Sequence, residues 1–257
     1  MYLDTSWGKV FYEFCEGKNP IIFIHGAGCN IKVWEEVINR ISGKVPYLLI
    51  DLPLHGKSRV DEDILTRLNS ISDYGDFILE IIDKLSLSEF LVCGHSMGGA
   101  ISLDLLARKD TRIKGGIIVS SGAVLRVNPV LFEGLKSNPE DTLSKVSRLA
   151  IAKDAPNELF IRVFELFSSA DLKVVYRDFL LCDRFDLRNK LEEIEVPVLI
   201  VVGSDDVMTL PKLSEELSNK IPKSKLEIVE GKGHMLPLES PDNLAELIVN
   251  FWKELTK

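Results

Sequence analysis

The sequence lacks glutamine altogether, and among its 257 residues there are only four cysteines and four histidines. Cys15, Cys29, Cys93 and Cys182 form no CxxC pair and show no spacing typical of a metal site. We therefore expect buried free thiols in a reducing compartment, with no metal and no organic cofactor. The absence of glutamine, together with frequent isoleucine, lysine and glutamate, favours a heat-adapted source.

Positive charge is also scarce, since 31 Lys and Arg stand against 39 Asp and Glu and give a net charge of −8. No basic cluster stands out, which disfavours nucleic acid and polyanions as partners. The longest apolar runs, such as residues 197–202, are too short to span a bilayer, and the first residues do not resemble a signal peptide. We expect a cytoplasmic globular protein, monomer or homodimer, that acts on a small molecule.

Short apolar runs recur along the chain and alternate with longer segments of helical periodicity. Such runs are typical of strands buried on both faces of a parallel sheet covered by helices. The order therefore predicts a doubly wound α/β sheet, with an antiparallel hairpin over residues 3–14 at its start. The predicted parallel strands comprise residues 21–24, 47–50, 90–93, 117–119, 198–202 and 226–229.

Helices are expected between these strands, with Ser72 as the N-cap of one and Pro241 at the start of the last. Residues 124–191 contain no strand-like run, and their apolar residues recur at helical spacing. We interpret this segment as a helical cap inserted over the carboxyl edge of the sheet, where open α/β sheets bind ligands. Residues 1–123 and 192–257 would then form the core domain.

The segment Gly94-His95-Ser96-Met97-Gly98-Gly99 lies between a predicted strand and a predicted helix. A sharp turn at this place strains the serine and requires glycine at both flanks, because a Cβ atom would clash. The turn exposes the Ser96 hydroxyl and directs the N–H of Met97 towards an oxyanion. We therefore predict that Ser96 is a nucleophile; the alternative is a glycine-rich turn with an incidental serine.

A serine hydroxyl needs a base, and His234 is the only histidine that follows Ser96. Because nucleophile, acid and histidine succeed one another along the chain in a fold of this type, we assign His234 as the base. The loop after residues 198–202 offers Asp205 and Asp206 as the acid that orients His234. Placement alone leaves both carboxylates open.

The loop after the first parallel strand reads His25-Gly26-Ala27-Gly28. We expect the N–H of Ala27 to be the second oxyanion donor, because its flanking glycines allow a close approach to substrate. His25 is expected to brace this loop. A dinucleotide-binding loop would also place G-x-G after a strand, but Ile31 occupies the position of its third glycine.

These motifs resemble those of the α/β-hydrolase superfamily, and the resemblance covers nearly the whole chain. It implies Asp206 rather than Asp205 as the acid, because members place it third after a glycine. Leu54 departs from the glycine that is frequent in the second of the motifs. The matching segments are His25-Gly26-Ala27-Gly28, Asp51-Leu-Pro-Leu-His55-Gly56-Lys-Ser58, the Ser96 turn, Gly203-x-x-Asp206 and Gly233-His234, with Trp34 as the usual aromatic residue of the first helix.

Within the superfamily, the turn Gly-His-Ser-Met-Gly-Gly-Ala is most similar to that of monoacylglycerol lipases and related carboxylesterases. Menaquinone-pathway synthase relatives usually have Arg where this chain has Ala100. Carbon–carbon bond hydrolases usually have Asn in place of His95, and haloalkane dehalogenases have Asp in place of Ser96. The resemblance therefore implies an esterase.

We accordingly expect a serine hydrolase that cleaves a short- to medium-chain or monoacylglycerol-like carboxylic ester through an acyl-enzyme on Ser96. The same residues could instead hydrolyse a carbon–carbon bond, a lactone or an amide, or carry out perhydrolysis. A non-catalytic ligand-binding protein of the same fold is the further alternative. The cap residues expected to line the substrate pocket are Leu125, Val130, Leu131, Phe160, Val163, Phe164 and Phe167.

Overall fold

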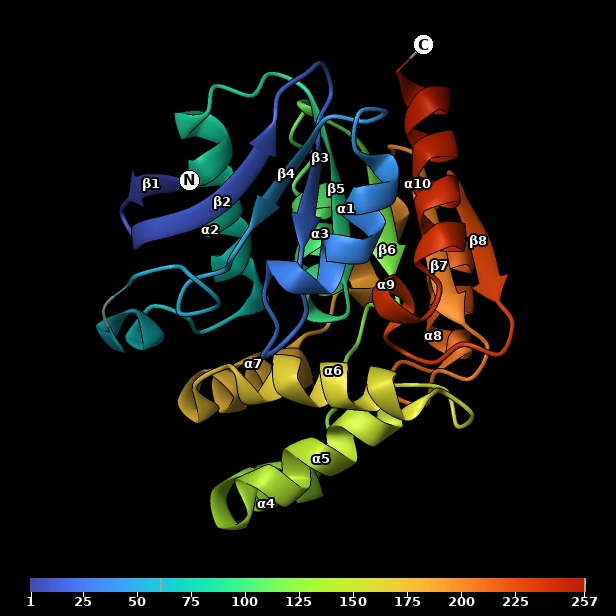
Figure 1. Cartoon of the computed structure of the whole chain (residues 1–257). Helices are drawn as coiled ribbons and strands as arrows, with labels where there is room; N and C mark the ends of the chain where they lie inside the picture. The colour runs from blue at the N-terminus through green and yellow to red at the C-terminus, as the bar shows by residue number, and fades with distance from the viewer. Residues whose placement is uncertain (61, 257) are drawn as a thin grey trace.

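In the computed structural model, which describes residues 1–60 and 62–256, eight strands form one sheet in the order β1-β2-β4-β3-β5-β6-β7-β8 (Figure 1). The hairpin of β1 (Tyr2–Thr5) and β2 (Gly8–Cys15) joins β4 (Tyr47–Ile50) in antiparallel pairing. The expected hairpin and the six expected parallel strands are confirmed. The parallel strands are β3 (Ile21–Ile24), β4, β5 (Phe90–His95), β6 (Ile113–Val119), β7 (Val198–Gly203) and β8 (Ser224–Val229).

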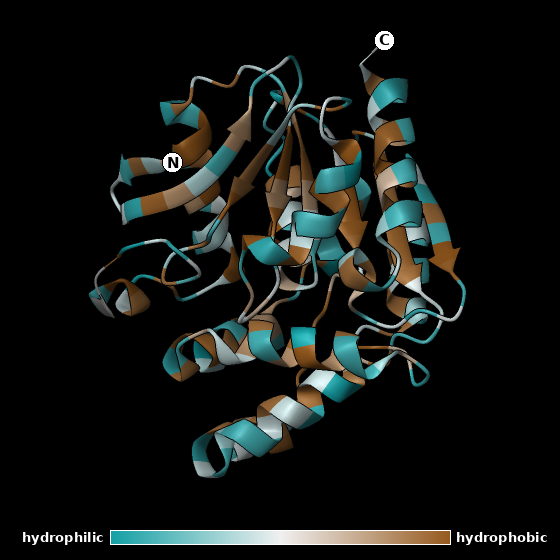
Figure 2. Cartoon of the chain, in the orientation of Figure 1, coloured by the Kyte–Doolittle hydropathy of each residue, from teal (hydrophilic) through white to brown (hydrophobic). Residues whose placement is uncertain are grey.

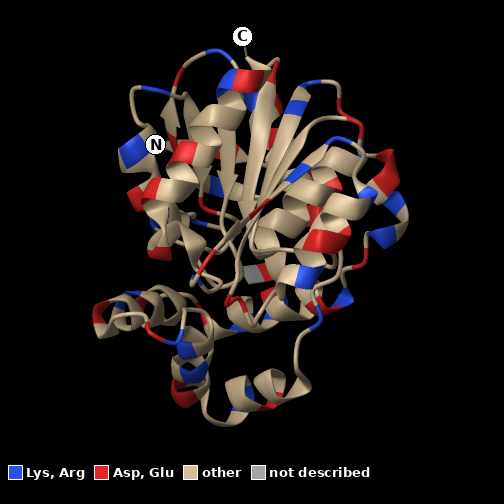
Figure 3. Ribbon diagram, turned by 90° about the vertical axis from the view of Figure 1, so that its right-hand side faces the viewer, with Lys and Arg blue, Asp and Glu red and all other residues tan. Residues whose placement is uncertain are grey.

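Helices cover both faces of this sheet, which explains why β3, β5 and β7 are buried along their whole length. One face carries α1 (Glu35–Ile41), preceded by the short helix η1 (Ile31–Trp34), and α10 (Pro241–Leu255) (Figure 1). The other face carries α2 (Ile71–Lys84), α3 (Met97–Ala107) and α8 (Pro211–Lys220). The central strands are hydrophobic in Figure 2, whereas Figure 3 shows the charged residues mainly on the helices and loops around them. Short helices complete the core at η2 (Glu62–Thr66), η3 (Arg188–Glu193) and α9 (Leu236–Glu239).

The start of α2 differs from the sequence prediction, in which Ser72 was the N-cap. Ser70 is the N-cap, because its backbone is extended (φ −149°, ψ 165°) and its N–H donates to the carboxylate of Asp73 at 2.7 Å. Ser72 lies inside the first turn, where its hydroxyl donates to Asp104 of α3 at 2.6 Å. The helix therefore begins at the capping box of Ser70 and Asp73, two residues before the predicted N-cap Ser72.

Four α-helices lie between β6 and β7 among the residues that the structure describes, and they cover the carboxyl ends of the strands (Figure 1). We call them the cap helices: α4 (Pro129–Ser137), α5 (Pro139–Leu149), α6 (Asn157–Ser168) and α7 (Leu172–Arg184). Their position places an additional layer over the sheet edge at which the predicted catalytic loops end. No helix in the described ranges is both long enough and apolar enough to cross a lipid bilayer.

Candidate active site

The nucleophile candidate Ser96 occupies a strained turn between β5 and α3. Its backbone has φ 56° and ψ −118°, a conformation that a residue with a side chain rarely adopts. Two hydrogen bonds hold it there: its N–H donates to the carbonyl of Val119 at 3.0 Å, and the Ser121 hydroxyl donates to its carbonyl at 2.7 Å. The neighbouring strand β6 thus fixes the strained serine from one side.

Three glycines around this turn leave no room for a side chain. A Cβ atom on Gly94 would lie 1.9 Å from the Gly98 carbonyl oxygen, and one on Gly98 would lie 2.2 Å from the carbonyl oxygen of Ile24. A Cβ atom on Gly99 would lie 2.5 Å from the side chain of Ser121. The backbone of the turn therefore lies in direct contact with β3 and with Ser121, which follows β6. This contact is the physical reason for the glycine pattern in the sequence.

The oxyanion-donor candidates Ala27 and Met97 flank the serine. A Cβ atom on Gly26 would lie 3.1 Å from the Cβ atom of Ser96, so the loop after β3 runs directly beside the nucleophile. Within residues 1–60 and 62–256, neither the N–H of Ala27 nor that of Met97 donates a hydrogen bond to another residue. Both donors are thus available to a ligand.

His25 braces this loop. Its Nε2 accepts the N–H of Leu52 at 3.1 Å, and its Nδ1 lies 2.9 Å from the Gly26 carbonyl oxygen. Burial, followed by the nearby His55, lowers the pKa of His25 well below its usual value. A neutral ring that accepts at Nε2 carries its proton on Nδ1, so His25 donates to Gly26. The ring therefore joins the ends of β3 and β4.

The base candidate His234 is paired with Asp206, not with Asp205. His234 Nδ1 lies 2.9 Å from Asp206 Oδ2, and both side chains are buried. Asp205, in contrast, accepts from the Ser204 hydroxyl at 2.8 Å in an exposed turn. Burial alone would raise the pKa of Asp206, but the charge and hydrogen bonds of His234 and Thr209 outweigh it and lower the pKa. Asp206 is therefore a carboxylate that can hold the Nδ1 proton of His234.

Thr209 is a member of the site that sequence reasoning missed. Its hydroxyl donates to Asp206 Oδ2 at 2.7 Å and lies 3.1 Å from His234 Nδ1. The N–H groups of Met208 and Thr209 donate to the other oxygen, Oδ1, at 2.9 and 2.8 Å. The only sequence signal is an aspartate that begins a turn, since such side chains often accept N–H groups two or three residues later.

His95, which precedes Ser96, supports the loop that carries His234. Its Nε2 lies 2.9 Å from the carbonyl oxygen of His234, and the two rings are 4.9 Å apart. Burial, followed by the charge of His234, lowers the pKa of His95 to about 3. His95 is therefore neutral and donates its Nε2 proton to the His234 carbonyl. Among the described residues its Nδ1 is buried without a hydrogen-bond partner, and a Cβ atom on Gly26 would lie 3.4 Å from it.

The comparisons with known proteins show the family of the chain. A model of the alpha/beta hydrolase family matches residues 21–247. The chain belongs to the alpha/beta hydrolase family. A pimeloyl-[acyl-carrier protein] methyl ester esterase of Yersinia pseudotuberculosis is 24% identical, over 96% of this chain and 98% of that protein. Two solved esterases have the same fold. A thermophilic esterase is 30% identical and has a TM-score of 0.87, over 100% of this chain and 98% of that chain. An esterase from Exiguobacterium antarcticum is 24% identical and has a TM-score of 0.90, over 98% of both chains.

In this alpha/beta hydrolase, Ser96 and His234 open into one cavity of about 230 Å³. Ala27 and Thr209 also line it, so the loop after β3, the Ser96 turn and the loops of Thr209 and His234 meet at one place. The rest of the lining comes from the segment after β6, the cap helices and the loop after β7. These residues are Leu125, Arg126, Val127, Asn128, Leu131, Val146, Leu149, Phe179, Cys182, Val207 and Met208.

Two of the seven cap residues expected to line the substrate pocket, Leu125 and Leu131, line this cavity. Of the other five, four pack against apolar residues of the cap helices or the core, and one, Val130, lies on the surface. Val163 and Phe167 are buried among these helices, and the rings of Phe160 and Phe164 stack at a centroid distance of 6.2 Å. Val130 has 73% of its surface exposed on the outer side of α4.

The described residues contain no group of three or more His, Cys, Asp or Glu side chains that could hold a metal ion. The four cysteines are free thiols, and burial raises the pKa of Cys29, Cys93 and Cys182. Such thiols are poor nucleophiles, because the thiolate is the reactive form. Within the cavity, Ser96 with His234 is therefore the pair best suited to nucleophilic chemistry.

Proposed function

We propose that this protein hydrolyses carboxylic esters through an acyl-enzyme on Ser96. The observation that carries the proposal is the meeting of Ser96 and His234 in one cavity, with Asp206 and Thr209 behind the imidazole. The elements that acyl transfer needs are a nucleophile, a base held in one tautomer and donors for an oxyanion. In this proposal Ser96 is the nucleophile, His234 is the base, and the N–H groups of Ala27 and Met97 are the donors.

In the proposed mechanism, Ser96 Oγ attacks the ester carbonyl carbon while His234 Nε2 takes the hydroxyl proton. The carbonyl oxygen becomes an oxyanion and accepts hydrogen bonds from the N–H groups of Ala27 and Met97, each typically worth about 10²–10³ in rate. His234 then gives its proton to the departing alcohol. A water molecule, deprotonated by His234, attacks the acyl carbon. His234 then returns this proton to Ser96 Oγ as the acyl–oxygen bond breaks, which releases the carboxylic acid and free Ser96.

The substrates we propose are short- to medium-chain acyl esters. The cavity of about 230 Å³ is smaller than the roughly 300–1,000 Å³ usual for drug-sized ligands. Its walls are mainly apolar and come from the proposed core, residues 1–123 and 192–257, and the proposed cap, residues 124–191. Each buried methylene is worth about 0.8 kcal/mol, or about fourfold in kcat/KM, until the chain reaches the cavity wall.

Hydrolysis of p-nitrophenyl esters of increasing acyl length tests this proposal, with Ser96→Ala as the control. We expect kcat/KM to rise from acetate and then fall, and the variant to lose turnover. Full activity of Ser96→Ala would refute the acyl-enzyme. The same enzyme is also assayed for hydrolysis of lactones, amides and a carbon–carbon bond and for peracid formation. The reaction with the highest kcat/KM decides between ester hydrolysis and these alternatives.

The setting of the reaction is also a proposal. The free cysteines and the net charge of −8 support a cytoplasmic protein with a small-molecule partner and no nucleic acid. The absence of glutamine supports heat adaptation. A melting temperature in the ordinary mesophilic range, about 45–65 °C, would contradict the last of these.

A further inference from the structure

Asp178 is a wholly buried carboxylate that the mechanism above does not use. It lies on the cap helix α7 and binds three separate segments of the core. Its Oδ2 accepts the N–H of Gly28 at 2.9 Å and lies 2.8 Å from Nε2 of His55. Its Oδ1 accepts the hydroxyl of Tyr74 at 2.7 Å. One cap side chain thus contacts the oxyanion loop, the loop after β4 and the helix α2.

The charge of Asp178 is balanced by His55. Nδ1 of His55 lies 2.9 Å from the carbonyl oxygen of Pro53, and its Nε2 faces the carboxylate. Because both ring nitrogens face acceptors, the ring that fits this site is the imidazolium, which donates from both. Burial alone would lower the pKa of His55, but Asp178 outweighs it and raises the pKa. The pair is therefore a buried ion pair between cap and core.

The bond to Gly28 bears on the geometry of the oxyanion loop. The N–H of Cys29 donates to the carbonyl of Gly26 at 3.2 Å, which closes a β-turn with Ala27 and Gly28 at its centre. Gly28 has φ +62° and Ala27 does not have a positive φ, which is the pattern of a type II turn. In the opposite orientation of the central peptide, the carbonyl of Ala27 would face the carboxylate of Asp178. The carboxylate therefore selects one of the two orientations.

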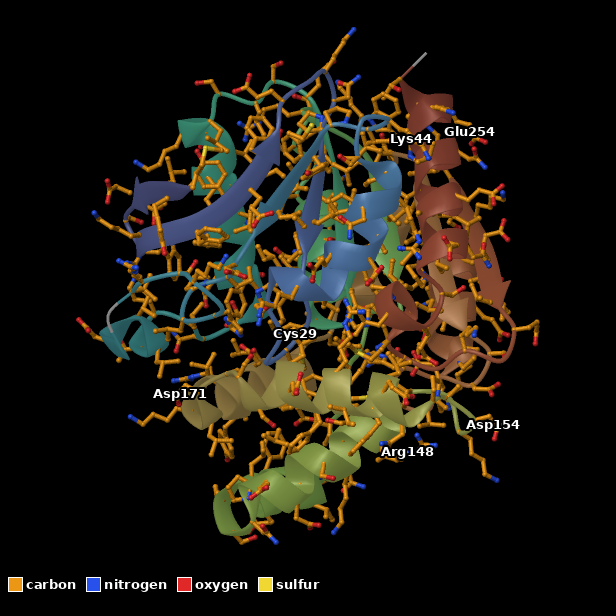
Figure 4. The ribbon with its side chains drawn as sticks, viewed as in Figure 1. Cys29, Lys44, Arg148, Asp154, Asp171 and Glu254 are labelled. Carbon is orange, nitrogen blue, oxygen red and sulfur yellow. The ribbon has the colours of Figure 1, made fainter. Side chains whose placement is uncertain are left out.

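The surroundings show how tightly the cap meets this turn. A Cβ atom on Gly28 would lie 3.1 Å from Val175, which precedes Asp178 by one turn of α7. Figure 4 labels Cys29 where the end of the sheet meets the cap helices. His25 holds the carbonyl of Gly26 from the core side, so the turn is bonded from both sides.

We propose that Asp178 is a positioning residue that holds the Gly26–Cys29 turn, and with it the N–H of Ala27, in the orientation that binds the oxyanion. This inference rests on the proposed function, since it assigns to Ala27 the role of oxyanion donor. Without this acceptor the Gly28 N–H is no longer fixed, and the turn, including the adjacent Gly26–Ala27 peptide that carries the donor, can shift. Misplacement of a catalytic group by about 1 Å can cost about 100-fold in rate.

The experiment compares Asp178→Asn with Asp183→Asn, a matched control on the same helix. Asp183 accepts the N–H of Val127 at 3.0 Å and, among the described residues, has no hydrogen bond to the oxyanion turn. Three quantities are measured: kcat and KM for a p-nitrophenyl ester, the rate constant of Ser96 labelling by a fluorophosphonate, and the melting temperature. For Asp178→Asn we expect kcat and the labelling rate to fall about 10- to 100-fold, with KM within about threefold of the wild type. The control should keep wild-type kcat and labelling rates.

Loss of stability alone would not support the proposal. If Asp178→Asn melts earlier but keeps kcat and the labelling rate within twofold of the wild type, Asp178 is a structural residue and the inference is overturned. A rise in KM at constant kcat overturns it as well, because substrate binding rather than the oxyanion would then be affected. If the single variant does not fold, the double variant His55→Asn with Asp178→Asn, which leaves neither charge unpaired, is measured with the same expectation.

The labelling arm separates this inference from the proposed function. If the fluorophosphonate does not label wild-type Ser96, the proposed function is wrong and the role assigned to Asp178 falls with it. If wild-type Ser96 is labelled and Asp178→Asn is labelled equally fast, the proposed function stands and only the inference fails.

Discussion

Replacement of Thr209 by valine tests whether the acid–base pair depends on more than His234 and Asp206. Valine fills almost the same space as threonine, so the change removes the hydroxyl and little packing. Asp206 Oδ2 would keep the contact with His234 at 2.9 Å and lose the hydroxyl donor at 2.7 Å. Its Oδ1 would keep both backbone N–H donors.

The magnitude follows from the hydrogen bond that is lost. A hydrogen bond to a charged group contributes about 1.5–3 kcal/mol, which corresponds to about 10- to 150-fold in rate if all of it acts in the transition state. Asp206 keeps three of its four donors, so we expect the lower end, a fall in kcat of about tenfold. KM should change little, because the hydroxyl of Thr209 is engaged by Asp206 and valine keeps the shape of the cavity wall.

The assay is steady-state hydrolysis of a p-nitrophenyl ester by the wild type, Thr209→Val and Thr209→Ser. The serine variant keeps the hydroxyl and loses the methyl group, so it should recover most of kcat despite some loss of stability. If Thr209→Val turns over within twofold of the wild type, the threonine is only a packing residue. If Thr209→Ser loses as much kcat as the valine variant, the hydroxyl is not what matters.

Three further predictions concern stability. The pKa of His95 is lowered to about 3, so below pH 6.5 the native state binds fewer protons than the unfolded state. The free energy of unfolding therefore falls by roughly 4–5 kcal/mol as the pH falls towards 3. In urea unfolding at pH 7 and pH 4, His95→Asn should lose less of this free energy than the wild type. Gly94→Ala should give no folded protein by circular dichroism, because its methyl group would lie 1.9 Å from the Gly98 carbonyl oxygen. The control Gly43→Ala, whose methyl group would have nothing within 4 Å, should fold. Its free energy of unfolding should fall by only about 1–2 kcal/mol, because alanine is strained at a positive φ. Glu239→Leu leaves two backbone N–H groups without their acceptor and should lower the free energy of unfolding by about 2 kcal/mol in urea titrations.

Features set by neighbouring residues could be predicted from the sequence. The Ser96 turn follows from the glycines on both sides of the serine, because each of them lies where a Cβ atom would clash. The parallel strands follow from runs of consecutive apolar residues. The choice of Asp206 over Asp205 needed the family resemblance, because their position in the loop makes both carboxylates equally good candidates for the acid.

Features that depend on packing between distant segments could not be predicted. Gly28, His55 and Tyr74, the partners of Asp178, lie more than 100 residues before it in the chain, and no local pattern connects them. The lining of the cavity was difficult for a related reason. An amphipathic cap helix shows which of its faces is apolar but not whether that face meets the core, another cap helix or a substrate, so Phe160 was expected to line the cavity and Phe179 was not.

The cap helices are bonded to both loops that the mechanism requires. On one side Asp178 binds the oxyanion turn at Gly28. On the other side Glu239 accepts the N–H of Ala152, between two cap helices, at 2.9 Å and that of Gly233, next to the base, at 3.0 Å. These directional bonds to backbone N–H groups therefore tie the loops of the proposed oxyanion donor and the proposed base to the cap. Substitutions in the cap should therefore change the rate of the chemical step as well as the choice of substrate.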